Sequence, residues 1–234
     1  MKKVLFGLFA LSTVAMAAET NLYLRTGADL YGKYDVISVE GYDVSDEDLD
    51  EFSYEFAIEA TREIYPDLEV GVGLAYQKHG DPETYSTSES EYGMSFYDKY
   101  EIPGYTSIPL YLTAKYKFNA VNNFVPYIKA NLGYSFNDKD GSFGYSGTAY
   151  DSANDELYSL EFDGKVDVKV EDGLYYGIGA GFEYNNFTMD LMYQVNKADA
   201  KIALHVDEET YKFKKDYDYS RITLGFGYKF NLDI

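Results

Sequence analysis

The stretch GLYYGIGAGFEYNNFTMDLMYQVN, residues 173 to 196, decides the fold. Bulky apolar residues occupy every second position from Leu174 to Tyr184, and the positions between them hold mostly small or polar residues. The pair Asn185-Asn186 interrupts the pattern, which then restarts and continues to Asn196. Alternation with period two is typical of β-strands with one apolar and one polar face, so the stretch predicts two such strands joined by a tight turn.

The same alternation occurs in eight segments, each close to or above the 9–11 residues that a tilted transmembrane strand needs. They span residues 21–33, 52–63, 68–77, 107–118, 124–136, 173–184, 187–196 and 219–230. Short connections at 66–67, 119–123 and 185–186 alternate with long ones at 34–51, 78–106, 137–172 and 197–218. The pattern predicts an all-β fold: an eight-stranded antiparallel up-and-down transmembrane β-barrel with short periplasmic turns and long extracellular loops.

The first 18 residues, MKKVLFGLFALSTVAMAA, predict a secretory signal peptide because two lysines precede an apolar run and small residues follow it. The apolar run is shorter than the ~20 residues of a membrane-spanning helix. Residues 19–234 then form one outer-membrane β-barrel domain. We expect the protein in the cell outer membrane, with extracellular loops and both ends of the mature chain in the periplasm.

Periodicity alone does not say which face of the strands points inward, but the signal peptide, the unequal loop lengths and the strand lengths together favour a membrane barrel with its polar face inside. Arg62 is the only charged residue on the eight apolar faces, near a strand end where a long side chain can snorkel. The polar faces carry both signs in balance, whereas a soluble barrel would have its apolar face inside. Two contacts are expected inside, Arg25–Glu59 and Glu69–Lys115. The predicted lumen charge network comprises Arg25, Asp29, Glu55, Glu59, Glu69, Lys115, Lys129, Asp190, Arg221 and Lys229.

The interior of an eight-stranded barrel is just wide enough to be filled by side chains. Glycines on the polar faces, at positions 71, 73, 177, 179, 181, 225 and 227, leave room for the charged side chains opposite. We therefore expect the charges to plug the lumen, and the alternative is a narrow porin-like passive pore for ions or small solutes. Pro109 and Pro126 each remove a ladder donor inside a predicted strand, so we expect a bulge or a strand end there.

The composition limits the possible partners. A net charge of -20 argues against nucleic acid, which requires basic patches. There is no cysteine, so an exported chain must take its stability from its fold or its surroundings. Of the 27 tyrosines, those on the outward face are expected to form two interfacial girdles.

Two segments continue the alternation beyond the height of the bilayer. KVDVKVEDG at 165–173 and KIALHVD at 201–207 predict β-hairpins that project above the membrane. Their free edges would suit β-augmentation or adhesion, and the alternative is a set of ordered loops with a charged fringe.

Enzymatic chemistry has weak support. The two histidines, His79 and His205, lie in or near predicted outside loops, where Ser86, Ser88 and Ser90 also lie, but no spacing specifies a triad. We expect solvated histidines and no enzyme, with a lipid-modifying activity as the least favoured alternative. The acidic run DVSDEDLDE at 43–51 could offer oxygen ligands to Ca²⁺ or Mg²⁺, but it lacks EF-hand spacing, so no metal site or cofactor is predicted.

The last predicted strand contains TLGFGYKF, residues 223–230, and this segment resembles the assembly signal of outer-membrane barrels. The matching positions are Thr223, Gly225, Tyr228 and Phe230. This chain continues through residues 231–234, whereas the last strand in that group commonly ends at its final aromatic residue. In its architecture, nearly all of the mature chain resembles the OmpA-like, OmpX-like and OmpW-like group of small outer-membrane barrels. This resemblance implies insertion by the barrel-assembly machinery of a Gram-negative outer membrane.

These observations predict a non-enzymatic outer-membrane barrel that acts in surface interaction, adhesion or outer-membrane integrity. The expected partners are outer-membrane lipid, lipopolysaccharide, the assembly machinery and an extracellular protein or host ligand at the loops. We expect a monomer.

Overall fold

The computed structural model describes residues 20–35, 38–39, 42–43, 52–81, 85–91, 94–100, 104–138, 140–145, 148–151, 156–158, 164–206 and 209–232. The predicted signal peptide lies outside these residues, as does nearly all of the acidic run 43–51. In the described part of the chain, no helix is long and apolar enough to cross a membrane.

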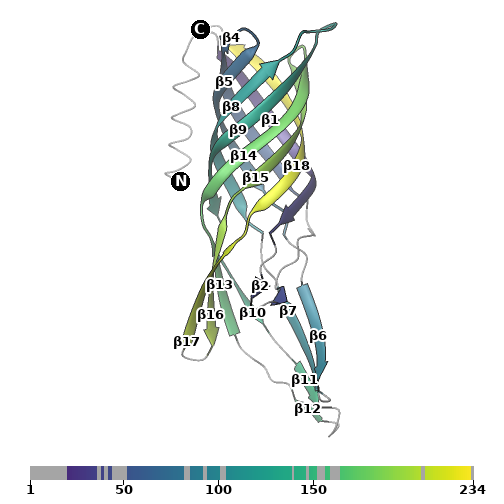
Figure 1. Ribbon diagram of the computed structural model, residues 1–234, viewed down its shortest axis with the longest axis vertical. Coiled ribbons are helices and arrows are strands. Elements are labelled where there is room, and N and C mark those ends of the chain that lie inside the picture. Colours follow the sequence, from purple (N-terminus) through teal and green to yellow (C-terminus); the bar gives the residue numbers. More distant parts are fainter. Residues whose placement is uncertain are drawn as a thin grey trace.

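Eight long strands close into an antiparallel barrel (Figure 1). Around the ring they follow the order β1-β18-β15-β14-β9-β8-β5-β4, and the first strand closes the barrel by pairing with the last. The predicted segments are confirmed, with ends that move by at most two residues. The strands are β1 (Thr20–Tyr34), β4 (Tyr54–Tyr65), β5 (Leu68–Lys78), β8 (Thr106–Lys117), β9 (Phe124–Asp138), β14 (Gly173–Tyr184), β15 (Phe187–Asn196) and β18 (Tyr219–Leu232).

The short connections gather at one end of the barrel, called here the turn end. Each contains a residue with positive φ: Asp67 at 68°, Asn123 at 65° and Asn185 at 56°. Asn and Asp adopt this left-handed backbone more readily than other non-glycine residues, because their short polar side chains bond to the nearby backbone. The turn residues in the sequence therefore fix the hairpin positions, and through them the register.

The two strand prolines behave differently from each other. Pairing between β5 and β8 is interrupted between the pairs Leu74–Leu110 and Gln77–Ser107, opposite Pro109, and it resumes in the same register. Pro109 thus produces a gap in the ladder inside β8, so neither the expected bulge nor a strand end occurs there. Pro126 is the third residue of β9 and pairs with Phe182 of β14, so it does not end its own strand either. The ladder to β8 ends beside it, where its carbonyl accepts a bond of 2.8 Å from the Phe118 N–H.

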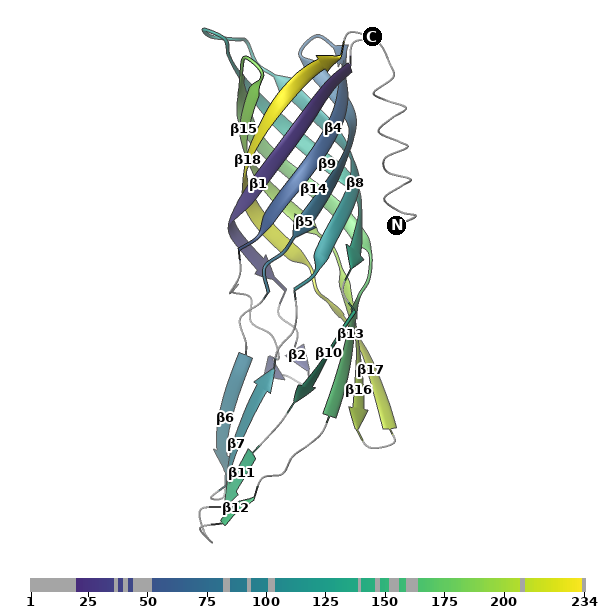
Figure 2. The same cartoon turned by 180° about the vertical axis from the view of Figure 1, so that it is seen from behind.

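Further strands project from the other end of the barrel, called here the sheet end (Figure 2). One four-stranded sheet has the order β10-β13-β16-β17, a second has the order β12-β11-β7-β6, and β2 pairs with β3. Both segments in which alternation continues beyond the barrel, 165–173 and 201–207, contribute strands to the first sheet. The strands are β2 (Ser38–Val39), β3 (Tyr42–Asp43), β6 (Tyr85–Glu91), β7 (Met94–Tyr100), β10 (Asp140–Tyr145), β11 (Thr148–Asp151), β12 (Glu156–Tyr158), β13 (Gly164–Val170), β16 (Asp199–Val206) and β17 (Glu209–Asp216).

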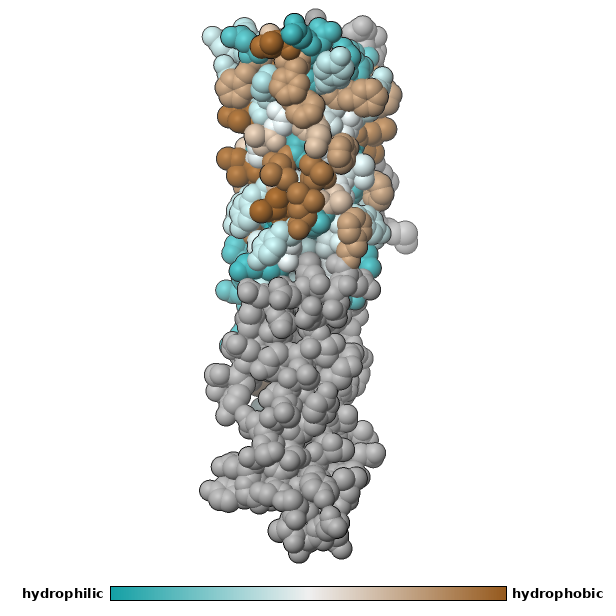
Figure 3. Space-filling model, turned by 90° about the vertical axis from the view of Figure 1, so that its right-hand side faces the viewer, coloured by the Kyte–Doolittle hydropathy of each residue, from teal (hydrophilic) through white to brown (hydrophobic). Residues whose placement is uncertain are grey.

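The outside of the barrel is apolar around its middle. Figure 3 shows hydrophobic side chains gathered on one face between hydrophilic rims. Exposed outward residues include Leu112, Leu132 and Ile178. Outward tyrosines stand toward both ends of the band, with Tyr76 and Tyr134 on strand halves near the sheet end and Tyr116, Tyr184 and Tyr228 near the turn end. Such an apolar belt with aromatic borders is typical of the outer surface of a membrane-spanning β-barrel.

Candidate functional site

Burial alternates along each barrel strand, and it places the charged face inside. On β1, Leu24 is 44% exposed, whereas Tyr23 and Arg25 on either side of it are 1% and 7% exposed. Successive side chains of a strand point to opposite faces of the sheet, so the side chains at the polar positions of every strand line the lumen. An ion in such an interior is tolerable only when it is paired and hydrogen-bonded.

The middle of the lumen is organised around Glu59 of β4. Its carboxylate accepts bonds from Arg25 Nη1 at 3.0 Å, from Lys129 Nζ at 2.5 and 2.7 Å, and from the Tyr111 hydroxyl at 2.8 Å. Arg25 also binds Asp190 of β15. Two cations and two carboxylates thus neutralise one another at buried positions.

The turn end of the lumen holds a second layer, in which lysines surround two carboxylates. Lys115 Nζ lies 2.6 Å from Glu183 Oε1 and 3.4 Å from Glu69 Oε2. The Tyr23 hydroxyl donates toward both carboxylates, at 3.0 Å to Glu69 and 2.9 Å to Glu183, and its ring lies 3.8 Å from the Lys115 ammonium. Lys117 and Lys229 complete this layer.

The sheet end of the lumen holds a third layer around Arg221. This fully buried guanidinium lies 2.6 Å from Glu55 Oε2 and 3.5 Å from Asp29 Oδ2, and it donates to Gln194 Oε1 at 2.8 Å. Thr223 donates to Asp29 at 2.7 Å. The predicted charges of the lumen therefore fall into three stacked layers.

Several of these contacts bridge strands that are not neighbours. Arg25 on β1 reaches Asp190 on β15 across β18, and Glu59 on β4 reaches Lys129 on β9 across β5 and β8. The predicted pairs Arg25–Glu59 and Glu69–Lys115 also form, each between adjacent strands. Side chains from strands that are not neighbours therefore meet at all three levels of the lumen, as Gln77 of β5 and Gln194 of β15 do in the third layer.

Gly73 illustrates why the polar faces need small residues. A Cβ atom on Gly73 would lie 2.4 Å from the ring of Tyr111, which is buried and donates to Glu59. Contacts that short force the neighbour to move. The expectation was room for charged side chains, and at Gly73 the neighbour is a tyrosine instead. At Gly225 the expectation fits, since a Cβ atom there would lie 2.9 Å from Arg25 Nη2.

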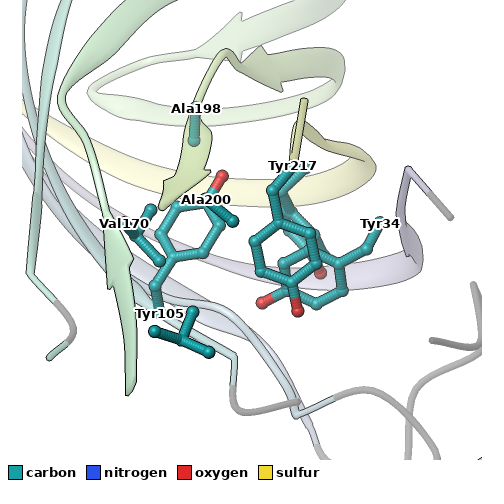
Figure 4. Packing of buried hydrophobic residues seen from close by; sticks show 8 residues of the cluster. Tyr34, Tyr105, Val170, Ala198, Ala200 and Tyr217 are labelled. Carbon is teal, nitrogen blue, oxygen red and sulfur yellow. The ribbon is translucent and has the colours of Figure 1, made fainter. Parts of the chain in front are cut away.

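Above the third layer an aromatic cluster covers the lumen at the sheet end (Figure 4). Tyr34 stacks on Tyr217 with ring centroids 4.7 Å apart, and Tyr105 meets Tyr34 edge-on at 5.7 Å. Val170 and Ala200 of the β10-β13-β16-β17 sheet pack against these rings. The cluster joins the projecting sheet to the mouth of the barrel, and we refer to these residues with Val168, Ala198 and Tyr219 as the mouth cluster.

His79 lies beside the mouth cluster, and the expectation of a solvated loop histidine is wrong for it. The ring is 1% exposed and contacts Tyr105 and Tyr219 with centroid distances of 4.9 and 4.2 Å. Its Nε2 lies 2.9 Å from Ser107 Oγ, while its Nδ1 has no hydrogen-bond partner in the described part of the molecule. The strand position of His205 is described, but its side chain lies outside the described part, as do the side chains of Ser86, Ser88 and Ser90.

The predicted assembly-signal residues occupy both faces of β18. Thr223 and Gly225 face the lumen, next to Asp29 and Asp190 respectively, whereas Tyr228 and Phe230 are exposed on the outside. A cavity of about 560 Å³ lies near the end of this strand, at the turn end. Its lining residues include none of the ten predicted network charges: Thr20, Asn21, Glu63, Ile64, Tyr65, Pro66, Asn231 and Leu232.

The sequence-based prediction missed the tyrosines and amides of the network. Tyr23, Tyr111 and Tyr127 each donate to a carboxylate, with Tyr127 2.7 Å from Asp190. Gln77 and Gln194 extend the layer around Arg221. The alternation along each strand could have indicated them, since all five stand at positions on the polar face of their strands.

A closed antiparallel barrel with an apolar belt and a charged, filled interior defines the class of small transmembrane β-barrels. The chain belongs to the family described as outer membrane protein beta-barrel domain, whose pattern matches residues 4–230. The protein is accordingly an outer-membrane barrel.

Individual relatives are distant. An uncharacterized protein of Pasteurella multocida (strain Pm70) is 26% identical over 98% of both chains. The crystal structure of OprG from Pseudomonas aeruginosa is 14% identical, with a TM-score of 0.46 over 92% of this chain and 97% of that one. Ail of Yersinia pestis, crystallised with the heparin analogue sucrose octasulfate, is 15% identical, with a TM-score of 0.40 over 92% of this chain and all of the other.

Proposed function

We propose that the protein is a non-enzymatic, non-conducting outer-membrane barrel that acts through its projecting sheets in surface interaction, adhesion or outer-membrane integrity. The observation that carries this proposal is the filled lumen, in which three layers of ion pairs lie beneath the mouth cluster. A passive pore needs a continuous wet path, and eight strands leave little space once such side chains meet.

The projecting sheets support a role in contact with other molecules. Each four-stranded sheet ends in strands that pair on one side only within the described residues. Such edges offer unpaired backbone groups to an extended partner segment. A structure that is rigid inside and open at its sheet edges is suited to holding a binding surface away from the membrane.

The orientation of the barrel in the membrane is inferred, like the export signal, from the sequence pattern. We infer that residues 1–18 are a signal peptide, that the domain extends from residue 19 to the C-terminus, and that the sheet end faces the outside of the cell. Short turns face the periplasm in barrels of this kind. The chain then acts as a monomer among outer-membrane lipid and lipopolysaccharide after insertion by the assembly machinery.

The surroundings of His79 support a non-enzymatic role. A catalytic histidine needs an orienting group on one ring nitrogen and access to substrate at the other. Here Nδ1 has no partner among the described residues, and both His79 and Ser107 are buried. The pair therefore serves packing at the mouth.

Removal of the β16–β17 hairpin tests the proposed function. Ala198 and Tyr217 are already joined by a backbone bond of 2.9 Å, so an Asn-Gly turn can replace residues 199–216 between them. Non-adherent Gram-negative cells that display the full chain should adhere to epithelial monolayers several-fold more, or resist detergent better, than cells with the trimmed chain. Equal adhesion and equal detergent resistance at matched surface levels would contradict the proposal.

A further inference from the structure

His79 stands where the segment that follows β5 meets the mouth cluster. It comes directly after the last residue of β5, and its ring lies against Tyr105 and Tyr219, two members of that cluster. The carbonyl of the next residue, Gly80, accepts a bond of 3.0 Å from the Tyr34 hydroxyl. The histidine and its neighbour therefore contact three of the four tyrosines of the mouth cluster.

A chain of hydrogen bonds leads from the same ring to the base of the β10-β13-β16-β17 sheet. His79 Nε2 lies 2.9 Å from Ser107 Oγ, which donates to Asn137 Oδ1 at 2.7 Å. Asn137 Nδ2 donates in turn, at 2.8 Å, to the carbonyl of Glu171, which lies between β13 and β14. His79 is thus connected to the sheet both by packing at the mouth and by this chain at the junction with the barrel.

The hydrogen bonds of Asn137 fix the tautomer of the histidine. Because Asn137 Nδ2 donates to Glu171, its Oδ1 faces Ser107 and accepts the hydroxyl hydrogen of that serine. The Ser107 oxygen then accepts from His79, so the neutral ring carries its proton on Nε2. Any second proton must go to Nδ1, which has no hydrogen-bond partner among the described residues.

The surroundings of the ring oppose a positive charge. Arg221 lies close enough to act on His79, and it has the same sign, so Arg221 and burial together hold the pKa of His79 well below its usual range. The carboxylates of Asp29 and Glu55 are already bound to Arg221, at 3.5 and 2.6 Å. Two further carboxylates near the mouth also have partners: Asp81 accepts from the Gly104 N–H at 2.8 Å, and Asp218 accepts from the Ala198 N–H at 2.9 Å and binds Lys197.

A proton on Nδ1 would place a charged donor among aromatic rings without an acceptor. An unpaired buried charge is far more costly than a solvated one, so the charged ring is more stable in water. His79 reaches water only if it leaves the two rings that cover it, and Gly80 then moves with it. Tyr34 loses its bond to the Gly80 carbonyl, and Tyr34 is the ring that stacks on Tyr217 (Figure 4).

We propose that His79 is a pH-sensitive latch, which keeps the β10-β13-β16-β17 sheet packed over the mouth of the barrel near neutral pH and loosens this packing in acid, while the eight barrel strands stay paired. The open form takes up a proton below a pH of about 6.5, the ordinary pKa of histidine, whereas the closed form does not. The latch is therefore closed above that pH, and each pH unit below it favours the open form up to tenfold. The inference goes beyond the proposed function and does not depend on which side of the membrane the sheet faces.

The chain has no cysteine, so a single introduced thiol reports the opening. Ala200→Cys places the thiol in the mouth cluster, where Ala200 is fully buried, and Lys201→Cys places it at the adjacent, exposed position of the same strand. The ratio of the two labelling rates with a methanethiosulfonate reagent cancels the effect of pH on the thiol chemistry. For the full-length folded protein in detergent, this ratio should rise about tenfold from pH 7.5 to pH 5.5.

Variants of the two histidines separate His79 from the other groups that titrate. With His79→Gln the labelling ratio should change less than twofold over the same pH range, because the latch no longer takes up a proton. With His205→Gln, which removes the other histidine of the chain, the ratio should still rise about tenfold. His79→Phe, which keeps a ring against the mouth cluster, replaces His79→Gln if that variant fails to fold.

Three results would overturn the proposal: a labelling ratio that does not rise in acid when His79 is present, an equal rise in His79→Gln, or loss of heat-modifiable migration at pH 5.5, which would mean that acid unfolds the whole barrel. The same gel shows whether each variant is folded. Ala198→Cys, at another buried position of the mouth cluster, repeats the measurement if Ala200→Cys fails to fold.

Discussion

Glu59 is the residue on which the lumen network depends most, since it joins Arg25 of β1 to Lys129 of β9. Replacement of Glu59 by Gln keeps the shape but leaves two buried cations short of one negative charge. Loss of one partner of a buried pair typically costs about 3–5 kcal/mol. We expect urea unfolding of Glu59→Gln in lipid vesicles to show a loss of this size.

Glu63→Gln is the control for this prediction. Glu63 lies four residues further along the same strand, but it is exposed at the turn end. Substitutions at such surface positions usually change stability by less than about 0.5 kcal/mol. Equal losses in the two variants would mean that the ion pairs of the lumen contribute nothing beyond general surface charge.

His79, just beyond the end of β5, makes stability depend on pH near neutrality. Burial lowers the pKa of His79 well below its usual range, so the folded protein holds the ring neutral. The unfolded chain takes up a proton below a pH of about 6.5, which favours unfolding. The stabilising effect is therefore complete above that pH and is lost as the pH falls toward the folded pKa.

We expect the free energy of unfolding to decrease between pH 7 and pH 5.5 in the wild type and to change less in His79→Gln. Urea titrations of the folded barrel at several pH values measure this difference. Parallel curves for the two proteins would show that the histidine does not titrate on unfolding.

Among the elements, the β10-β13-β16-β17 sheet is held to the barrel by the mouth cluster. Tyr34 is the central member, because its ring contacts those of Tyr105, Tyr217 and Tyr219. Truncation of a buried aromatic side chain typically costs about 3–5 kcal/mol. Tyr34→Ala should therefore release the sheet while the eight barrel strands remain paired.

Limited proteolysis of Tyr34→Ala should cut β16 and β17 faster than in the wild type, with heat-modifiable migration of the remaining barrel retained. Tyr31→Ala is the control, since Tyr31 on the same strand is 52% exposed on the outside. Unchanged proteolysis in Tyr34→Ala would show that the sheet is held by other contacts.

The strands and their inward and outward faces were predictable because every barrel strand lies between the bilayer on one side and the polar lumen on the other. A side chain faces either the bilayer or the lumen, so a period of two persists through each segment, and one misplaced charge would be costly. The Asn and Asp residues of the short turns then fix where each strand ends. The gap at Pro109 was not predictable in this way, because the same missing donor can be absorbed by a bulge or by a local break in pairing.

The layering of the lumen was less predictable. Contacts between adjacent strands, such as Arg25–Glu59, follow from register alone, but the meeting of Arg25 with Asp190 depends on the closure and stagger of the whole ring. His79 was misjudged for a related reason. Its burial arises from Tyr105 and Tyr219, which are distant in the chain, so no local pattern indicates it.

The whole molecule combines a closed β-barrel with sheets that extend from one end (Figures 1 and 2). Its charge is distributed unevenly, since the lumen pairs both signs internally in a chain of net charge -20. A closed barrel of this kind makes a rigid support for the sheets.

Single-channel conductance of the refolded protein in a planar bilayer tests the closed lumen most directly, with heat-modifiable migration as the check of folding. The filled layers around Glu59, Glu183 and Arg221 predict a folded barrel that gives no discrete conductance steps. Reproducible steps from folded protein that grow with salt concentration would contradict this account, because they would mean that the charges line a passage.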